Sequence, residues 1–209
     1  MPSKRTHLQL FAAFVASLLF VAAAPTPVAS ASGEEPPFEL RFPQETDKTV
    51  WTSTFGAGRS GGRRHKGNDL MAPKMTEVYA VADGVVERVA RGSSAGRYIV
   101  IAHEDGWTSS YMHLNNDTPG TDNGRADWSQ TLAPGIDEGT VVAAGDLIGW
   151  VGDSGNAEWT GPHTHFELRK DGRAVNPFDD LLAALARDEA RLLFDFRPAA
   201  ASIIQDQIS

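Results

Sequence analysis

The chain has 209 residues, a formal net charge of −8 and no cysteine. The length indicates one domain with appendages, and the acidic balance argues against a nucleic-acid partner, because phosphate binding needs clustered Lys and Arg. The absence of cysteine excludes disulfides, a lipid anchor on cysteine and thiolate metal ligands, so any metal site must use histidine and carboxylate side chains.

Residues 1–31 have the composition of a secretory signal peptide. Two basic residues precede an apolar run at 10–24, and a small-x-small cleavage site follows at 29–31. An uncleaved membrane anchor is the alternative, but the run is short for a span and two prolines follow it. We therefore expect a mature chain that begins near Ser32, is secreted to the extracellular space, cell wall or periplasm, and has no stable membrane anchor.

A polar linker is expected at 32–41 and a single domain at 42–178. Apolar alternation within this domain predicts short strands at residues 77–82, 85–89, 98–102, 107–113, 141–142, 147–151 and 165–169. Asp83-Gly84 and Asp171-Gly172 are hairpin turn signals, and Glu104-Asp105-Gly106 predicts another turn. The expected fold is mainly β, with antiparallel sheets whose hairpins form a substrate groove, and one short C-terminal helix.

Residues 115–138 interrupt the strand pattern. The segment is rich in Asp, Asn, Gly and Thr, which predicts a long loop that adds little to the core. Asp117, Asp122 and Asp127 supply the oxygen ligands that calcium prefers, but their spacing argues against a site of the EF-hand type.

The C-terminal tail, residues 179–209, contains the one good helix candidate. Leucines at helical spacing form an apolar stripe within 179–196, Asp179 or Asp180 can cap the first turn, and Pro198 follows. This helix is too short to be a separate binding module, so we expect it to pack on the domain.

Four of the six histidines lie in three short motifs, which are His65-Lys66-Gly67-Asn68-Asp69, Ser110-Tyr111-Met112-His113-Leu114 and Gly161-Pro162-His163-Thr164-His165-Phe166-Glu167. His163 and His165 are two residues apart on a predicted strand, so their side chains point to the same face. Glycines around His65 argue against a helix, so we expect a loop that runs into a strand to carry His65 and Asp69. Catalytic zinc takes three protein ligands and leaves one position for water. Three of the histidines with Asp69 are therefore enough for an open zinc site and leave one for acid–base chemistry, which points to metal-assisted hydrolysis.

These motifs resemble those of the lysostaphin-type (LytM-like) zinc endopeptidases, whose members cut peptidoglycan cross-links. The resemblance covers residues 42–178 and includes further segments in family order, which are Phe55-Gly56, Ala80-x-x-Asp83-Gly84-x-Val86, Gly145-x-x-Ile148-Gly149 and Val175-Asn176-Pro177. The chain departs from the pattern at Asn68 and Thr164, where apolar residues are commoner, and in the longer loop at 115–138. We expect that loop to form a wall of the groove and to shift specificity.

The resemblance implies one zinc ion per chain, with His65, Asp69 and His165 as ligands. It makes His113 and His163 an unliganded catalytic pair. One of the two accepts the proton of the attacking water and the other stabilises the oxyanion, and the sequence does not decide which does which.

Two further side chains need separate interpretations. Glu167 is an alternative candidate for the general base, or it orients a metal ligand by hydrogen bonding to it. We favour the histidines as the acid–base groups. His103 ends a predicted strand just before a turn, so we expect it to make local hydrogen bonds and no catalytic contact.

The resemblance implies a secreted zinc metalloendopeptidase that hydrolyses peptide bonds in peptidoglycan stem peptides or cross-bridges, with a monomer favoured. One alternative is a non-catalytic, peptidoglycan-binding activator of another wall hydrolase, but such members typically lose zinc ligands and this chain keeps all five key positions. The other is a D-alanyl-D-alanine metallopeptidase, against which the Tyr-x-His and Gly-Pro-His-x-His motifs argue. Both a glycyl-glycine bond and a bond that involves D-alanine and diaminopimelate are open as the target.

Overall fold

A computed structural model describes residues 35–191, so the expected signal peptide and the end of the C-terminal tail lie outside the described residues. The strands are β1 (Val50–Trp51), β2 (Asn68–Met71), β3 (Glu77–Tyr79), β4 (Gly84–Gly92), β5 (Gly96–Ala102), β6 (Trp107–Leu114), β7 (Val141–Val142), β8 (Leu147–Trp150), β9 (His163–Lys170) and β10 (Arg173–Val175). Short 3-10 helices are η1 (Thr46–Lys48), η2 (Ser60–Gly62), η3 (Glu104–Gly106), η4 (Trp128–Gln130) and η5 (Gly155–Ala157). One α-helix begins at residue 178 and is described to residue 191.

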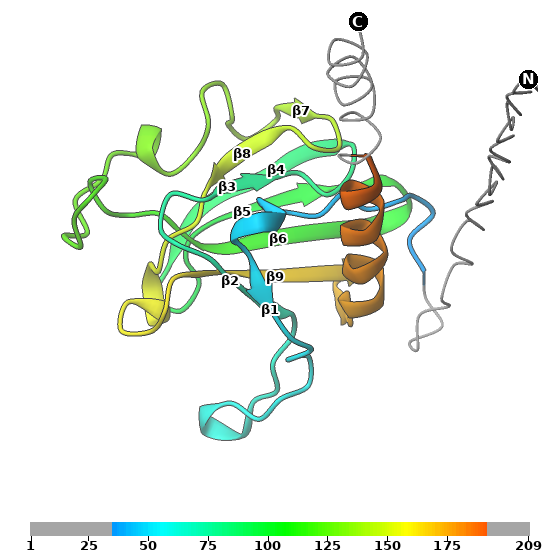
Figure 1. Cartoon of the computed structure of the whole chain (residues 1–209), viewed down its shortest axis with the longest axis horizontal. Helices are drawn as coiled ribbons and strands as arrows, with labels where there is room; N and C mark the ends of the chain where they lie inside the picture. The colour runs from blue at the N-terminus through cyan, green and yellow to red at the C-terminus, as the bar shows by residue number, and fades with distance from the viewer. Residues whose placement is uncertain (1–34, 192–209) are drawn as a thin grey trace, which may run out of the picture.

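The strands form one large antiparallel sheet and one small one (Figure 1). The large sheet has the order β1-β2-β9-β6-β5-β4-β7, with β10 also paired to β9. The small sheet consists of β3 and β8. This mainly antiparallel β architecture with one helix near the C-terminus confirms the fold class expected from the sequence.

The two faces of the large sheet have different roles. On one face Tyr111, Phe166 and Ile99 are fully buried, and Val78 and Ile148 of the small sheet belong to the same core. Because side chains alternate along a strand, the neighbouring positions point to the other face, where the polar residues of β2, β6 and β9 gather. The helix at 178–191 contributes buried apolar side chains to the core cluster, so it packs on the domain as expected.

Of the three expected turns, two connect paired strands and one does not. β5 pairs with β6 around η3, and β9 pairs with β10 around Asp171-Gly172. The hairpin expected at Asp83-Gly84 is wrong, because β3 pairs with β8 while β4 pairs with β5 and β7. The chain bends at 81–83, and the strands on either side of the bend, β3 and β4, join different sheets. A turn signal predicts a change of chain direction and does not determine the strand partner.

The long loop at 115–138 contributes to the core, contrary to the expectation from its composition. Thr131, Leu132 and Ala133 are buried, and Leu132 forms a bridge with Gly149 of β8. Local polarity predicted an exposed loop, but the loop's second half returns to the small sheet and packs there. The segment at 118–125 is the part that is exposed throughout.

Two carboxylates of this loop, those of Asp117 and Asp122, are bound to a lysine. The Nζ atom of Lys74 lies 2.7 Å from Asp117, 2.7 Å from Asp122 and 2.8 Å from Asp153. Burial lowers the pKa of Lys74, but the three carboxylates outweigh it and raise that pKa above its usual value. This ammonium therefore supplies positive charge to Asp117 and Asp122, two of the three carboxylates considered above as calcium ligands, and it attaches the loop to the domain.

Two replacements of different length in this loop are expected to change the free energy of unfolding by different amounts. Replacing 118–125 with a short Gly/Ser connection should change the free energy of unfolding by less than about 1 kcal/mol, because it removes exposed residues and one exposed ion pair. Replacing 118–137 should cost about 2–5 kcal/mol, because it also removes the buried Leu132. Urea unfolding of both variants measures the difference, and equal midpoints would contradict this assignment of the loop to the core.

Candidate metal centre and groove

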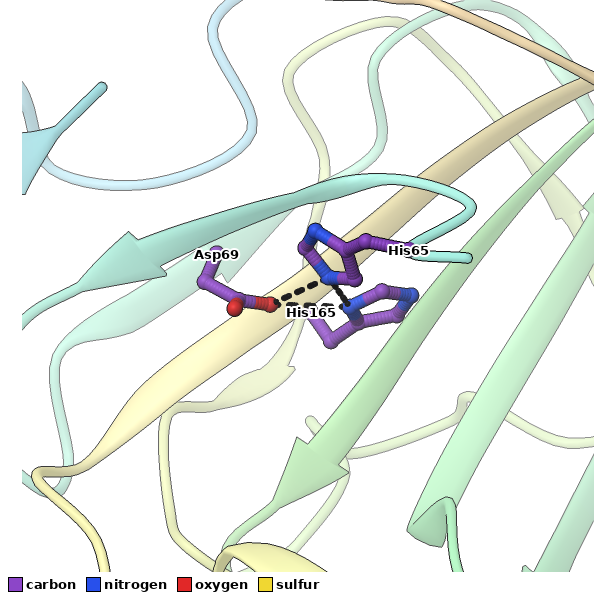
Figure 2. Close-up of side chains that lie close together, drawn as sticks. All are labelled: His65, Asp69 and His165. Atoms are coloured by element: carbon purple, nitrogen blue, oxygen red, sulfur yellow. Dashed lines mark hydrogen bonds and ion pairs between the residues drawn. The ribbon is translucent and has the colours of Figure 1, made fainter. Parts of the chain in front are cut away.

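His65 and Asp69, which share one motif, lie together with His165, which is 100 residues after His65 in the sequence (Figure 2). The Nε2 atom of His65 is 2.8 Å from Nδ1 of His165 and 3.0 Å from Oδ1 of Asp69. The same Oδ1 atom is 2.8 Å from Nδ1 of His165. Two imidazole nitrogens and one carboxylate oxygen therefore converge on one point.

Strand pairing and a preceding loop bring these side chains together. Asp69 on β2 is directly opposite His165 on β9, so both side chains leave the sheet on the same face. His65 lies before β2 in a loop that runs into this strand, as the glycine-rich sequence predicts. His65 is buried, and its ring lies 4.6 Å from that of His165 between centroids.

The second nitrogen of each ring is occupied by an oxygen acceptor. Nδ1 of His65 donates to the carbonyl oxygen of Thr54 at 2.9 Å, and Nε2 of His165 donates to Oε1 of Glu167 at 3.0 Å. A neutral imidazole carries one hydrogen, so the nitrogens that face each other both present lone pairs. With the Asp69 oxygen they form a set of three electron-pair donors, which repel one another unless a cation lies between them.

The titration properties of the site also favour a cation. Burial raises the pKa of Asp69, but interactions with His165, His65 and Arg59 outweigh it and hold that pKa well below its usual value. Burial lowers the pKa of His165, but the carboxylates of Asp69 and Glu167, which lie within hydrogen-bond distance of its ring nitrogens, outweigh it and raise that pKa. The protein environment therefore stabilises the Asp69 carboxylate anion and positive charge at His165, whereas burial lowers the pKa of His65.

His113 and His163 form a second pair beside this cluster. Their ring centroids are 4.9 Å apart, and Nε2 of His163 is 3.9 Å from Oδ1 of Asp69. Nδ1 of His113 donates to the carbonyl of Ser154 at 2.8 Å, and Nδ1 of His163 donates to the carbonyl of Gly161 at 2.9 Å. Both rings therefore keep an Nε2 lone pair available.

The backbone at His113 explains how its ring reaches the groove. Met112 is paired with His165, so regular alternation would turn His113 to the opposite face of the sheet. His113 instead has φ 63°, a left-handed conformation that costs a non-glycine residue about 1–3 kcal/mol. As a result, Met112 and His113 both line the groove. Burial and the neighbouring His163 and His165 lower the pKa of His113 to about 4, so its ring is neutral at pH 7.

The five candidate side chains lie in one open groove of about 710 Å³. Its lining residues come from the 59–71 region, the connection between β4 and β5, β6, β9 and the loop around η5. They are Arg59, Arg63, Arg64, His65, Lys66, Asp69, Met71, Ser94, Ala95, Met112, His113, Asn156, Ala157, Thr160, His163, His165, Glu167 and Arg169. No residue of 115–138 is among them, so the expectation that this loop forms a groove wall is wrong. After Leu114 the chain turns toward β8, and Asn115 N donates to the carbonyl of Trp150 at 3.0 Å.

The structure places the remaining candidates in supporting positions. Glu167 accepts from His165 and is paired with the guanidinium of Arg169. Asn68, which stands where apolar residues are commoner in the family, accepts a hydrogen bond from Thr54 N at 2.9 Å. It thereby positions the carbonyl that binds His65. His103 lies elsewhere and donates to the carbonyl of Asp83 at 2.7 Å, in accord with the local role expected.

Sequence reasoning missed the groups that orient the histidines and the aspartate. These are the carbonyls of Thr54, Ser154 and Gly161, and the Arg59 guanidinium, which lies 2.5 Å from Oδ2 of Asp69. Carbonyl groups have no residue-type signature, so no sequence signal identifies them. A single arginine among glycines is equally uninformative until the loop is folded.

Comparisons with known proteins identify the family of this chain. Residues 63–177, more than half of the chain, match peptidase family M23. Peptidoglycan DD-endopeptidase ShyA of Vibrio cholerae serotype O1 is 36% identical over 112 residues, which make up 54% of this chain and 22% of ShyA. The chain spans about a fifth of the length of the curated relatives that it matches.

Two solved structures are similar to the described fold. A zinc-containing peptidase from Vibrio cholerae has a TM-score of 0.53 and 28% identity, covering 66% of this chain and 39% of that chain. The catalytic domain of lysostaphin from Staphylococcus simulans has a TM-score of 0.51 and 24% identity, covering 65% of this chain and 94% of that domain, and it shares the fold. The resemblance inferred from the motifs is thus confirmed, and the chain belongs to peptidase family M23.

Proposed function

We propose that this chain is a secreted zinc metalloendopeptidase that hydrolyses peptide bonds of peptidoglycan. The observation that carries the proposal is the convergence of three oriented electron-pair donors, His65, Asp69 and His165, beside a second pair of histidines in an open groove. Membership of family M23 and the printed name of ShyA, a peptidoglycan DD-endopeptidase, support the same class of substrate. Among the described residues, no helix is long and apolar enough to cross a membrane.

The donor set fits zinc. His65 and His165 supply imidazole nitrogens and Asp69 supplies a carboxylate oxygen, which are ligand types of open catalytic zinc sites. Zinc bonds of about 2.0–2.1 Å with tetrahedral angles require donor atoms about 3.3 Å apart, only a few tenths of an ångström more than the separations of 2.8–3.0 Å seen here. A zinc ion held there would polarise the scissile carbonyl and lower the pKa of the attacking water.

The second histidine pair supplies proton transfer and charge stabilisation. Because Nδ1 of both His113 and His163 is bonded to a backbone carbonyl, each ring offers Nε2 to the groove. One Nε2 atom can accept the proton of the water and later deliver it to the leaving amine. The other, after it takes a proton from solvent at Nε2, can donate a hydrogen bond to the oxyanion of the tetrahedral intermediate. Glu167 is already bonded to His165 and Arg169, so it suits orientation better than proton transfer.

The five converging side chains also bear on the alternatives. A non-catalytic activator has no need for three oriented donors and two rings with free Nε2 atoms, so the geometry favours an enzyme. A D-alanyl-D-alanine metallopeptidase is disfavoured by the match to family M23. Because the chain spans only about a fifth of its curated relatives, its substrate is assigned from its own groove and tested directly.

Digestion of purified sacculi tests this proposal. We expect the zinc-loaded protein to release fragments with new amino and carboxyl termini from at least one of two sacculus types, glycine-bridged or directly cross-linked through diaminopimelate. Mass spectrometry of the fragments identifies the bond. A chelator should stop the release and added zinc should restore it, whereas intact cross-links in both sacculus types after zinc loading would overturn the proposal.

Replacing Glu167 with Gln should weaken zinc binding by about 10–100-fold, because the amide orients His165 without the negative charge that raises its basicity. Turnover should recover when zinc is supplied in excess. The matched control is Glu87→Gln on the exposed surface of β4. Zinc titration followed by assay at saturating metal separates the two roles. If Glu167→Gln binds zinc like the parent but loses turnover at saturation, Glu167 is itself the base.

A further inference from the structure

One wall of the groove is a short basic hairpin, residues 56–66, that projects from the sheet between β1 and β2 (Figure 1). Backbone hydrogen bonds join Gly56 N to the carbonyl of His65 at 2.8 Å and Arg59 N to the carbonyl of Arg63 at 2.9 Å. The tip at η2 contains Gly61 and Gly62, both with positive φ, which glycine adopts without strain. The basic hairpin therefore has a defined shape and leads directly into the candidate metal centre.

The hairpin carries four cations that line the groove, in a chain whose formal net charge is −8. Arg59 is paired with Asp69, and on the opposite wall Arg169 is paired with Glu167. Arg63, Arg64 and Lys66 are exposed, and the described part of the chain offers none of the three an acidic partner. Three uncompensated positive charges thus stand beside the reaction centre.

Contacts within the hairpin hold the guanidinium groups of Arg63 and Arg64 without using all of their N–H donors. Nε of Arg63 donates to the carbonyl of Ser60 at 3.2 Å, and an Nη of Arg64 donates to the carbonyl of Gly56 at 3.1 Å. Arginine has five N–H donors in a planar fork, so each group keeps donors for an external oxygen acceptor. Partial immobilisation also lowers the entropy lost when a ligand binds.

We propose that Arg63, Arg64 and Lys66 form a carboxylate-binding subsite that selects stem peptides with free carboxylates next to the scissile bond. This inference rests on the proposed function and specifies its substrate. Arg64 and Lys66 flank His65 in the sequence, so the bound carboxylate belongs within a residue or two of the cleaved bond. A peptide with a diaminopimelate or glutamate-type carboxylate offers such a group, whereas amidated peptides and glycine bridges do not. Arginine suits this role because its fork matches a carboxylate with two parallel hydrogen bonds.

Two soluble cross-linked peptides that differ only in free or amidated carboxylates test the subsite. We expect the zinc-loaded parent to prefer the free form by about tenfold in kcat/KM, mainly through KM, and added salt to reduce the preference. In the double variant Arg63→Gln/Arg64→Gln, the ratio of kcat/KM for the free peptide to kcat/KM for the amidated peptide should fall toward one. The matched control, Arg91→Gln/Arg125→Gln, removes the same charge from exposed positions outside the groove and should keep the ratio of the parent. Equal kcat/KM for both peptides in the parent overturns the subsite and leaves the proposed function intact.

A binding measurement distinguishes failure of the proposed subsite from failure of the proposed hydrolytic function. Calorimetry with the zinc-loaded protein and uncross-linked peptide, free or amidated, reports recognition without hydrolysis. Tighter binding of the free form that is lost in Arg63→Gln/Arg64→Gln upholds the subsite, even if the parent cleaves neither cross-linked peptide and the proposed function fails. Lys66→Gln provides an independent second variant, for which a weaker preference is expected, and equal affinities for the two forms in the parent overturn the subsite.

Discussion

Asp69→Ala and His65→Ala are each expected to lose zinc and to lower turnover by more than about a thousandfold. Each change removes one of three converging donor atoms, which lie 2.8–3.0 Å apart in the structure. A bound metal ion contributes several kcal/mol of transition-state stabilisation, and about 4 kcal/mol corresponds to a factor of a thousand in rate. Metal analysis after dialysis, together with assay on sacculi, measures both effects.

The control for Asp69→Ala is Asp47→Ala, which removes an exposed carboxylate in η1 and should keep both zinc and turnover. Circular dichroism of the variants shows whether each still folds. Full zinc occupancy in both Asp69→Ala and His65→Ala would refute the ligand assignment, whatever their activity.

Replacing His113 or His163 is expected to leave zinc in place and to reduce turnover by about 10²–10⁴-fold, the usual contribution of a general acid–base group. The reason is that both rings lie beside the metal centre, each with Nδ1 held by a backbone carbonyl and Nε2 free for the reaction. His163→Ala is a suitable variant on a regular strand. At position 113, His113→Asn is a better variant than His113→Ala, because φ is 63° there and Asn tolerates that conformation.

Zinc content distinguishes these two variants from a ligand variant. His165→Ala should lose the metal, whereas the His113 and His163 variants should keep it at parental occupancy. His103→Ala serves as the histidine control, since that ring is bonded to Asp83 and Ser109 outside the groove and should not affect turnover per folded molecule. Loss of zinc from either catalytic variant would show that the division between ligands and acid–base groups is wrong.

Most of the secondary structure could be predicted because strand alternation and turn residues are local signals. The strands observed at Gly96–Ala102, Trp107–Leu114 and Val141–Val142 lie at the predicted positions to within two residues. Pairing was less predictable. The chain does bend just before Gly84, yet β3 and β4 join different sheets, because the choice of partner depends on which buried faces meet after folding.

The loop at 115–138 shows the same limit for burial. Its composition is polar, and composition averages over the segment, whereas burial is decided residue by residue. Leu132 is 5% exposed because it packs against Gly149 of β8, a contact between residues that are 17 positions apart. The second half of the loop packs on the small sheet, and no residue of the loop lines the groove, so its expected role as a groove wall does not follow.

The sequence by itself determined the mainly β fold, the family and the five candidate side chains, since period-two alternation and closely spaced histidine motifs are encoded over a few residues. The tertiary structure decided which groups orient them. Thr54 and Arg59 act through contacts between separate segments of the chain, and His113 reaches the groove through a left-handed backbone conformation that no motif specifies. The basic hairpin is also a tertiary feature: its arginines are ordinary in a sequence of net negative charge, and they become a candidate subsite because the fold places them beside the metal centre.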